Sequence, residues 1–535
     1  MAMGMVADPR ALKPQNECAG EARFRLSPFS RCTGCLIAAG AAFAVSMDAT
    51  SADWRFRSSV SVRETYTDNV RLASRGNEQS DWITELSPSV GVSRRGARLQ
   101  LNADYSFTYR TFVNNDQANG HNNALRSNAL LDVWDRKLFL QGAASVAQQN
   151  ISTLGAISTN NSNLNSSRTE VRQATLSPYW VSRLGSVANL RAQLTLSRAE
   201  SDGAARALGT DTQGTQITIS SGPAFSDLGW SVAYSNNQTE STSGQFSERE
   251  TEAYTATVQY RLWPTVTALM TAGRDHNTFG NARGSTGGSF YTLGVNWVPS
   301  ARTSVNAQIG ERYFGKTASL DASHRTRLST WQVTYSEQIV TAPGLFSLPL
   351  NVDTATAIDR LFVAQFPDPI ERRQIVDAFI ALNGLPSTLT TAVDFLTNQV
   401  SLAKRLQGVF GLRGVRGSFL VTAFHSDRES QSTDAPVIST DPFALSSSVV
   451  QVGYSGVLSW RFSELTSGSA SLGQQKSKSV GSRTDTTNTL RLGLTHRLGP
   501  KLSGSVEYRF LDRDSTVVNA DVRENAVVGT LNMSF

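Results

Sequence analysis

The sequence has almost no cysteine, no long hydrophobic run and little lysine, and each shortage excludes a class of protein. All three cysteines, Cys18, Cys32 and Cys35, lie near the start of the 535-residue chain. The rest of the chain can therefore form neither a disulfide framework nor a thiolate metal site. No apolar run reaches the roughly 20 residues of a membrane-spanning helix. We therefore expect no transmembrane helix.

What replaces these features is a large share of hydroxyl and amide side chains. Only 39% of the residues are hydrophobic and 18% are charged, against about 25% charged in an ordinary soluble domain. With 16 prolines the chain is not a Pro-rich disordered polymer. This balance favours a sheet with one wet face and one apolar face.

The first 52 residues have the order of a secretory signal. The basic residues Arg23, Arg25 and Arg31 precede a short apolar core at 36–45, and small residues follow at 49–52. This arrangement predicts cleavage by a signal peptidase. We expect a leader and signal over 1–52 and a mature outer-membrane barrel over 53–535.

From residue 54 the chain alternates between apolar and polar side chains. Leu99, Leu101 and every second residue up to Tyr109 are apolar or aromatic, while the residues between them are polar. A period of two predicts strands, and runs of ten or more residues exceed those of a soluble sandwich. Strands can span lipid only in a closed barrel, because every backbone N–H and C=O needs a partner.

Connections and ends fit the same fold. Tight turns such as 135–137 and 498–500 alternate with long polar loops such as 150–167, and tryptophans recur near strand ends. The last strand ends on Phe535, and a terminal aromatic resembles the signal read by the barrel assembly machinery. The sequence predicts an all-β, closed antiparallel transmembrane barrel of about 20–22 strands in the bacterial outer membrane.

One segment, 353–398, changes to helical periodicity. Asp368 followed by Pro369 and Glu371 has the pattern of a helix start. The strands before and after the segment are expected to run in the same direction. Two explanations are open: a further strand lies near 340–352 or near 389–399, or the insert crosses the lumen. The candidate plug or gate residues are Ile358, Phe362, Asp368, Glu371 and Phe379.

Only seven of the 50 lysine and arginine residues are lysine. One interpretation is the codon usage of a GC-rich genome, which favours arginine. The other is a lumen lined with arginines whose guanidinium groups bind the carboxylates or phosphates of an acidic polymer. Asp104 and Glu507 share the lumen face, so the charge is mixed. The candidate lumen-lining residues are Arg55, Arg57, Arg63, Arg98, Arg110, Arg191, Arg491 and Arg509.

Two short motifs match patterns found in enzymes, but the predicted strands around them do not fit the corresponding sites. The segment 310–317 matches the phosphate-binding pattern GxxxxGK[ST], but it ends a strand and precedes another, whereas that loop requires a following helix. In His425-Ser426-Asp427 the serine points away from its neighbours on a strand. The histidines show no paired metal spacing, and no basic-aromatic module predicts nucleic-acid binding. We expect no enzyme, no catalytic or metal site, no cofactor and no nucleotide.

The segments 60–70, 80–88, 96–99, 148–151 and 398–406, together with the helical insert, resemble the outer-membrane proteins associated with the PEP-CTERM/exosortase sorting system. The resemblance covers most of the mature chain. It implies a genomic association with exopolysaccharide synthesis and with protein sorting to the cell surface. It gives no established activity and no known functional residue for this chain.

Three hypotheses follow from the sequence. The first is a channel for exopolysaccharide export, with exopolysaccharide or its export proteins as partners besides lipid and the assembly machinery. The second is a general diffusion porin. The third is a scaffolding barrel that docks partners through the helical insert.

Overall fold

The computed structural model describes residues 54–150, 162–164, 168–202, 208–244, 248–279, 286–341, 397–432, 447–479 and 483–535. Within these ranges the chain forms 22 strands and one short 3-10 helix, η1 (Asp116–Ala118). The strands are β1 (Trp54–Thr67), β2 (Asp81–Arg95), β3 (Leu99–Phe112), β4 (Gly120–Trp134), β5 (Leu138–Asn150), β6 (Arg168–Leu184), β7 (Ala188–Ser201), β8 (Thr210–Ser221), β9 (Leu228–Ser241), β10 (Arg249–Trp263), β11 (Val266–Asn277), β12 (Gly288–Ser300), β13 (Thr303–Arg312), β14 (Gly315–Arg325), β15 (Ser329–Val340), β16 (Ser401–Arg413), β17 (Gly417–Ser430), β18 (Ser448–Arg461), β19 (Thr466–Ser479), β20 (Arg483–Arg497), β21 (Leu502–Ser515) and β22 (Val522–Ser534). The predicted leader and signal, 1–52, lies outside the described residues.

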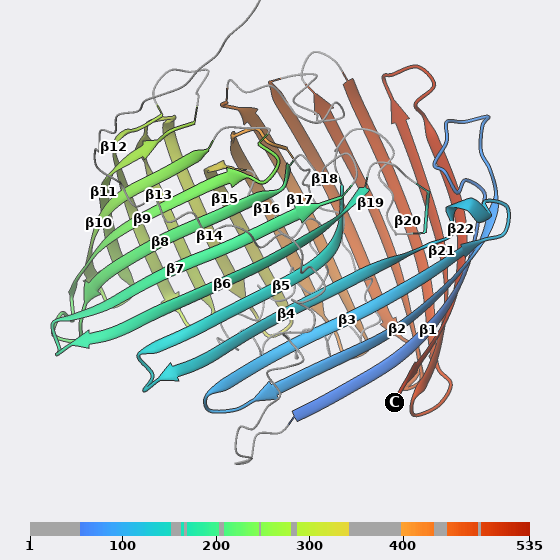
Figure 1. Cartoon of the computed structure of the whole chain (residues 1–535), viewed down its shortest axis with the longest axis horizontal. Helices are drawn as coiled ribbons and strands as arrows, with labels where there is room; N and C mark the ends of the chain where they lie inside the picture. Colours follow the sequence, from blue (N-terminus) through green and yellow to red (C-terminus); the bar gives the residue numbers. More distant parts are fainter. Residues whose placement is uncertain are drawn as a thin grey trace, which may run out of the picture. The chain divides into compact units, whose positions relative to one another are not determined.

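The sheet closes on itself. Each strand pairs antiparallel with the next, and β22 returns to β1, so the first and last strands lie side by side (Figure 1). The pairing of β1 with β22 runs over nine residue pairs, from Ser59 with Ser534 to Thr67 with Ala526. The expected closed antiparallel barrel is confirmed, with a strand number of 22.

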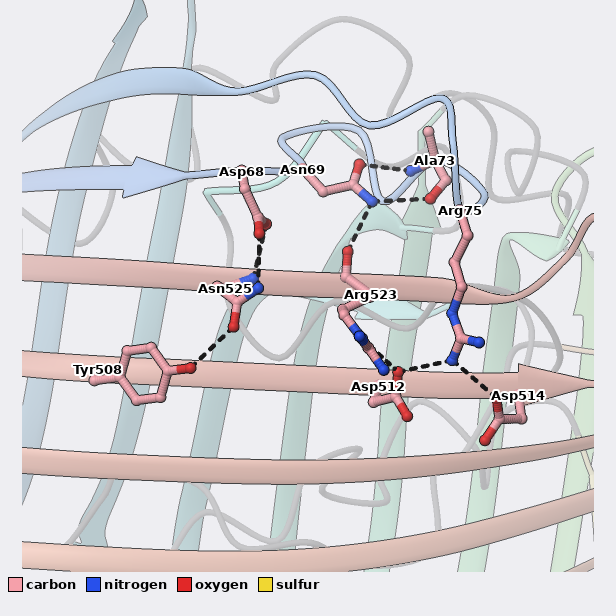
Figure 2. Close-up of polar contacts among 9 residues, drawn as sticks. All are labelled: Asp68, Asn69, Ala73, Arg75, Tyr508, Asp512, Asp514, Arg523 and Asn525. Carbon is pink, nitrogen blue, oxygen red and sulfur yellow. Dashed lines mark hydrogen bonds and ion pairs between the residues drawn. The ribbon is translucent and has the colours of Figure 1, made fainter.

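Side chains extend this closing seam on the outer surface, beyond the last pair of β1 and β22 (Figure 2). Asn525 donates its backbone N–H and its side-chain amide to Asp68, at 2.8 and 2.7 Å. Arg75 donates to Asp512 at 2.9 Å and to Asp514 at 3.0 Å. The hydrogen bond to Asp512 raises the pKa of Arg75 above its ordinary value, so the Arg75 guanidinium stays protonated at any physiological pH.

The two faces of the wall have opposite chemistry. On β1, Phe56 and Val62 point outward and are 71% and 41% exposed, whereas Thr65 and Thr67 point inward and are fully buried. The strands are 10 to 17 residues long, enough for the roughly 9–11 that cross a bilayer. Apolar outward residues suit lipid, and polar inward residues suit a wet lumen.

The connections differ between the two ends of the barrel. At one end they are two to six residues long; at the other they range from two residues, 313–314, to sixty, 341–400. The β4–β5 turn places Asp135 and Arg136 at φ of 44° and 55°, the left-handed geometry that matches strand twist in a tight hairpin. Short turns face the periplasm in such barrels and long loops face outward.

Tryptophan is concentrated at the short-turn end. Of the nine tryptophans, only Trp82 lies at the long-loop end, next to the start of β2. Most are exposed on the outer surface, among them Trp263 at 62% and Trp134 at 56%. Lys137 lies over the Trp134 ring at 5.7 Å. A belt of amphipathic rings marks the membrane interface. The tryptophans at the short-turn end are Trp54, Trp134, Trp180, Trp230, Trp263, Trp297, Trp331 and Trp460.

Among the described residues, no helix is long and apolar enough to cross a membrane. The closed 22-strand barrel, its apolar outer face and its aromatic belt place the protein in the bacterial outer membrane.

The predicted helical insert, 353–398, falls almost wholly outside the described residues, and so do its candidate residues Ile358, Phe362, Asp368, Glu371 and Phe379. The strands on either side of it are direct antiparallel neighbours, because β15 pairs with β16 from Ser329 with Leu412 to Val340 with Ser401. The expectation that these strands run in the same direction is therefore wrong.

Changing Phe535 to Asp should strongly reduce assembly into the outer membrane. Its backbone N–H donates to the carbonyl of Ser58 at 2.9 Å, and its ring, 61% exposed, continues the outward row of Leu531 and Met533. The change removes the terminal aromatic, and the charge itself costs only about 1 kcal/mol or less because the position lies near the membrane interface. The folded fraction is read from heat-modifiable gel migration. Val518→Asp, at an 85% exposed loop position, is the control; equal assembly of both variants would contradict the proposed signal.

Candidate functional site

The lumen wall holds most of the predicted arginines. Alternation places seven on the inner face of strands, opposite exposed outward neighbours such as Phe56, Leu492 and Val506. Arg98 is the exception, because it lies in the β2–β3 turn rather than on a strand. The seven are Arg55, Arg57, Arg63, Arg110, Arg191, Arg491 and Arg509.

Carboxylates neutralise several of these arginines. Glu85 is buried and accepts hydrogen bonds from Arg63 at 3.3 Å and from Arg110 at 3.0 Å. The three residues form one row, since Glu85 is the cross-strand partner of Arg63 on β1 and of Arg110 on β3. Farther toward the short-turn end, Arg57 contacts Asp104 at 3.3 Å.

A second buried carboxylate lies at the closing seam. Glu524 on β22 accepts hydrogen bonds from Thr67 at 2.9 Å, from Asn163 at 2.7 Å and from Arg509 at 3.3 Å. Both charged side chains of this pair are nearly inaccessible. Arg491 lies across the ladder from Arg509. Glu524 therefore joins the first strand, the last two strands and a residue of the β5–β6 loop.

Loop residues fill the mouth of the barrel at this seam. Val70 of the β1–β2 loop packs on the inward Ile83 and Phe112, and Leu164 packs against the same cluster. Leu72 packs on Leu511 and Val522 of β21 and β22. Apolar side chains thus replace water on the inner wall between β21 and β3, and the lumen is narrowed there.

These contacts change the expected electrostatics of the lumen. Arg57, Arg63, Arg110 and Arg509 each contact an inward carboxylate, and the Arg191 guanidinium lies 4.2 Å over the ring of Tyr179. A guanidinium that already shares a carboxylate has less capacity for a second one. Four of the seven inward arginines thus share three carboxylates, Asp104, Glu85 and Glu524, so part of the positive charge is offset and fewer open guanidinium forks are left for an acidic polymer.

Sequence reasoning noticed Asp104 and Glu507 on the lumen face but missed Glu85 and Glu524, the buried carboxylates that accept from Arg63, Arg110 and Arg509. Both could have been found by alternation. Glu85 is two residues after Ile83 on one face of β2, and Glu524 is two residues after Val522 on β22.

The inner wall of β6–β10 is different, because hydroxyl and amide side chains dominate it toward the long-loop end, whereas Arg191 lies toward the short-turn end. A cavity of about 330 Å³ opens there toward the long-loop end. Its lining residues are Gln173, Thr175, Thr195, Ser197, Thr212, Asn237, Thr239, Arg249, Thr251 and Thr341. Nine of the ten carry an uncharged hydroxyl or amide.

The cavity lies where the chain crosses the lumen. Arg249 on β10 donates to the backbone carbonyl of Asn398 at 2.6 Å, although Asn398 immediately precedes β16, six strands farther along the sheet. Gln399, next to Asn398, accepts hydrogen bonds from Ser430 and Ser432. The end of the 341–400 connection is therefore anchored inside the barrel.

The phosphate-binding pattern at 310–317 forms a β-hairpin. Its first and last residues, Gly310 and Thr317, are cross-strand partners on β13 and β14, and the turn is only Tyr313 and Phe314. Gly315 has φ of +114°, which a hairpin of this kind requires of glycine. Amide groups committed to a ladder cannot cradle phosphate.

The other enzyme motif is divided between two faces. Ser426 is buried on the inner face of β17, while His425 is exposed on the outer face. No group of three or more metal-ligating side chains occurs in the described parts of the chain.

A scan against protein-family models finds no match, and a search of curated proteins finds no relative. Solved structures similar to this chain are outer-membrane barrels. They include the FrpB iron transporter from Neisseria meningitidis (9% identity, 90% of this chain, 82% of that one, TM-score 0.46). The siderophore receptor PirA from Pseudomonas aeruginosa (11%, 90%, 80%, 0.43) and OpdK from the same organism (8%, 90%, 99%, 0.35) are others. All three TM-scores are below 0.5, and no function is inferred from the likeness.

Proposed function

We propose that the protein is an outer-membrane channel that carries a hydroxyl-rich surface polysaccharide. The observation that supports this most is the chemistry of the inner wall, where hydroxyl and amide side chains line the cavity on β6–β10 and four of the seven inward arginines contact carboxylates. The resemblance to PEP-CTERM/exosortase-associated barrels supports the same function, because those proteins accompany exopolysaccharide synthesis. Lipid, the barrel assembly machinery and export proteins would be the partners; no catalytic role is proposed.

A polysaccharide in transit exchanges its hydrogen bonds with water for hydrogen bonds with the wall. Hydroxyl and amide groups can donate and accept, so a sliding chain of hydroxyls finds partners in many registers. Fixed unpaired charges would instead trap an acidic polymer or repel it. A polar wall on which several arginines already contact carboxylates allows passage without tight retention.

Two other functions are compatible with the barrel. A general diffusion porin would pass small solutes of any kind, and a scaffolding barrel would dock a partner through the 353–398 insert. Loop residues narrow the lumen at the seam and at Asn398, which restricts bulky solutes more than an extended polymer that enters end-on.

Conductance of the purified full chain in planar bilayers tests the proposal, with graded neutral dextrans added to one side. We expect open-channel current that neutral dextran reduces by entering the lumen, and loss of surface polysaccharide when the gene is deleted in its host. A current that is indifferent to dextran would favour the porin. A barrel with no current and an unchanged cell surface would favour the scaffold.

A further inference from the structure

The cavity on β6–β10 has features of a binding site rather than of a plain stretch of wall. It is built from the inward residues of five consecutive strands, and Thr341 closes it from the end of β15. Its outward counterparts, such as Leu176, Leu196 and Ile217, are exposed to lipid. Ligand chemistry is therefore presented only toward the lumen.

Threonine dominates this lining, with six of the ten residues. Each threonine presents a hydroxyl beside a methyl group. A pyranose ring likewise alternates hydroxyls with C–H groups, so both parts find a partner on such a surface. None of the described lining residues is a carboxylate, and Arg249 is the one charged residue among them, so a ligand meets mainly hydroxyl, methyl and amide groups.

Cross-strand hydrogen bonds hold these hydroxyls in place before any ligand arrives. Thr175 contacts Ser197 at 3.0 Å, and Thr212 contacts Thr239 at 3.4 Å. In each pair either oxygen can donate, so the proton can reorient to suit a ligand. Groups ordered in advance lower the entropic cost of binding.

A glycine makes room for the cavity's amide. A Cβ on Gly214 of β8 would lie 2.6 Å from Oδ1 of Asn237 and 3.6 Å from Cβ of Thr195. Because Gly214 has no side chain, the Asn237 carboxamide lies over β8. Replacing Gly214 would displace that amide and fill the cavity without requiring a backbone change.

We propose that this cavity is a saccharide subsite that holds uncharged sugar units of the polymer in transit. Among the described lining residues Arg249 is the one cation, and it donates to the Asn398 carbonyl and so is directed toward the segment before β16. The subsite rests on the proposed function for its biological meaning. Its binding chemistry, however, can be measured in the absence of transport.

Titration calorimetry of the full chain in detergent tests the subsite, with maltoheptaose as the neutral probe and oligogalacturonate of the same length as the acidic one. We expect maltoheptaose to bind more tightly than the acidic probe, because the probe's carboxylates would lose water in the cavity while Arg249 is directed toward the Asn398 carbonyl. The double substitution Thr175→Val and Thr239→Val should weaken it about tenfold, because two hydroxyls are lost. Gly214→Val should weaken it at least as much. Thr108→Val is the matched control, since Thr108 pairs with Ser87 at 2.8 Å on another part of the wall.

Heat-modifiable migration confirms that each variant is folded before titration. Absence of maltoheptaose binding to the wild type, equal weakening by Thr108→Val, or tighter binding of the acidic probe would each overturn the subsite. Saccharide binding that is lost in the cavity variants, in a barrel that passes no current, would retain the subsite and reject the conduit.

Discussion

Glu524→Ala should destabilise the barrel by about 3–5 kcal/mol, the cost typical of removing one partner from a buried ion pair. Arg509 would keep its buried charge without the carboxylate 3.3 Å away, and its Nε already has no partner among the described residues. Thr67 and Asn163 would each lose an acceptor as well. Urea unfolding in detergent, with the midpoint and slope fitted together, measures the change.

Two variants separate the charge effect from general damage. Asp104→Asn breaks an ion pair that is about half exposed on both sides and should cost less than about 1 kcal/mol. The double variant Glu524→Leu and Arg509→Met removes both buried charges and should recover much of the loss. If Glu524→Ala stayed within about 1 kcal/mol of the wild type, the seam pair would have no role in closure.

Deleting 353–398 should raise single-channel conductance several-fold and sensitise cells to large antibiotics. The sequence predicts a capped helix in this segment, and an open 22-strand barrel leaves a wide lumen that outer-membrane transporters plug. The deletion is feasible because Val340 and Ser401, which flank the connection, are cross-strand partners. Neighbouring strands lie only about 5 Å apart, so the remaining residues bridge them easily.

Deleting 433–446, which joins β17 to β18 at the same end, is the control for loop loss. Arg249→Leu offers an independent test, since it removes the 2.6 Å hydrogen bond to Asn398 and should raise conductance to a smaller extent. Unchanged conductance in a well-assembled deletion variant would favour a docking role for the insert.

The class of fold follows from local pattern, whereas strand direction does not. Alternation such as that from Leu99 to Tyr109 fixes which side chains share a face. Direction comes from counting turns, and one miscounted turn reverses every later strand. The hairpin at Tyr313 and Phe314 is two residues long at the end where long loops occur, which makes such counting fragile. The expected direction of β16, which the structure shows to be wrong, rested on such a count.

The arginines were predicted to face the lumen, but their pairing with carboxylates was not, because register is a property of pairs of strands. The row of Arg63, Glu85 and Arg110 exists because β1, β2 and β3 align them at one level. A connection of thirteen residues, 68–80, separates β1 from β2 and does not fix that alignment as a two-residue turn would. The cavity depends on the same alignment across five strands.

The uneven placement of tryptophan gives the protein a built-in optical label. Eight of its nine indoles lie at the short-turn end, so its intrinsic fluorescence reports the surroundings of one leaflet almost alone. A quencher attached to lipids of that leaflet should dim most of the emission, while the same quencher in the opposite leaflet should reach mainly Trp82. The orientation of the reconstituted barrel can therefore be read from its emission without attaching a dye.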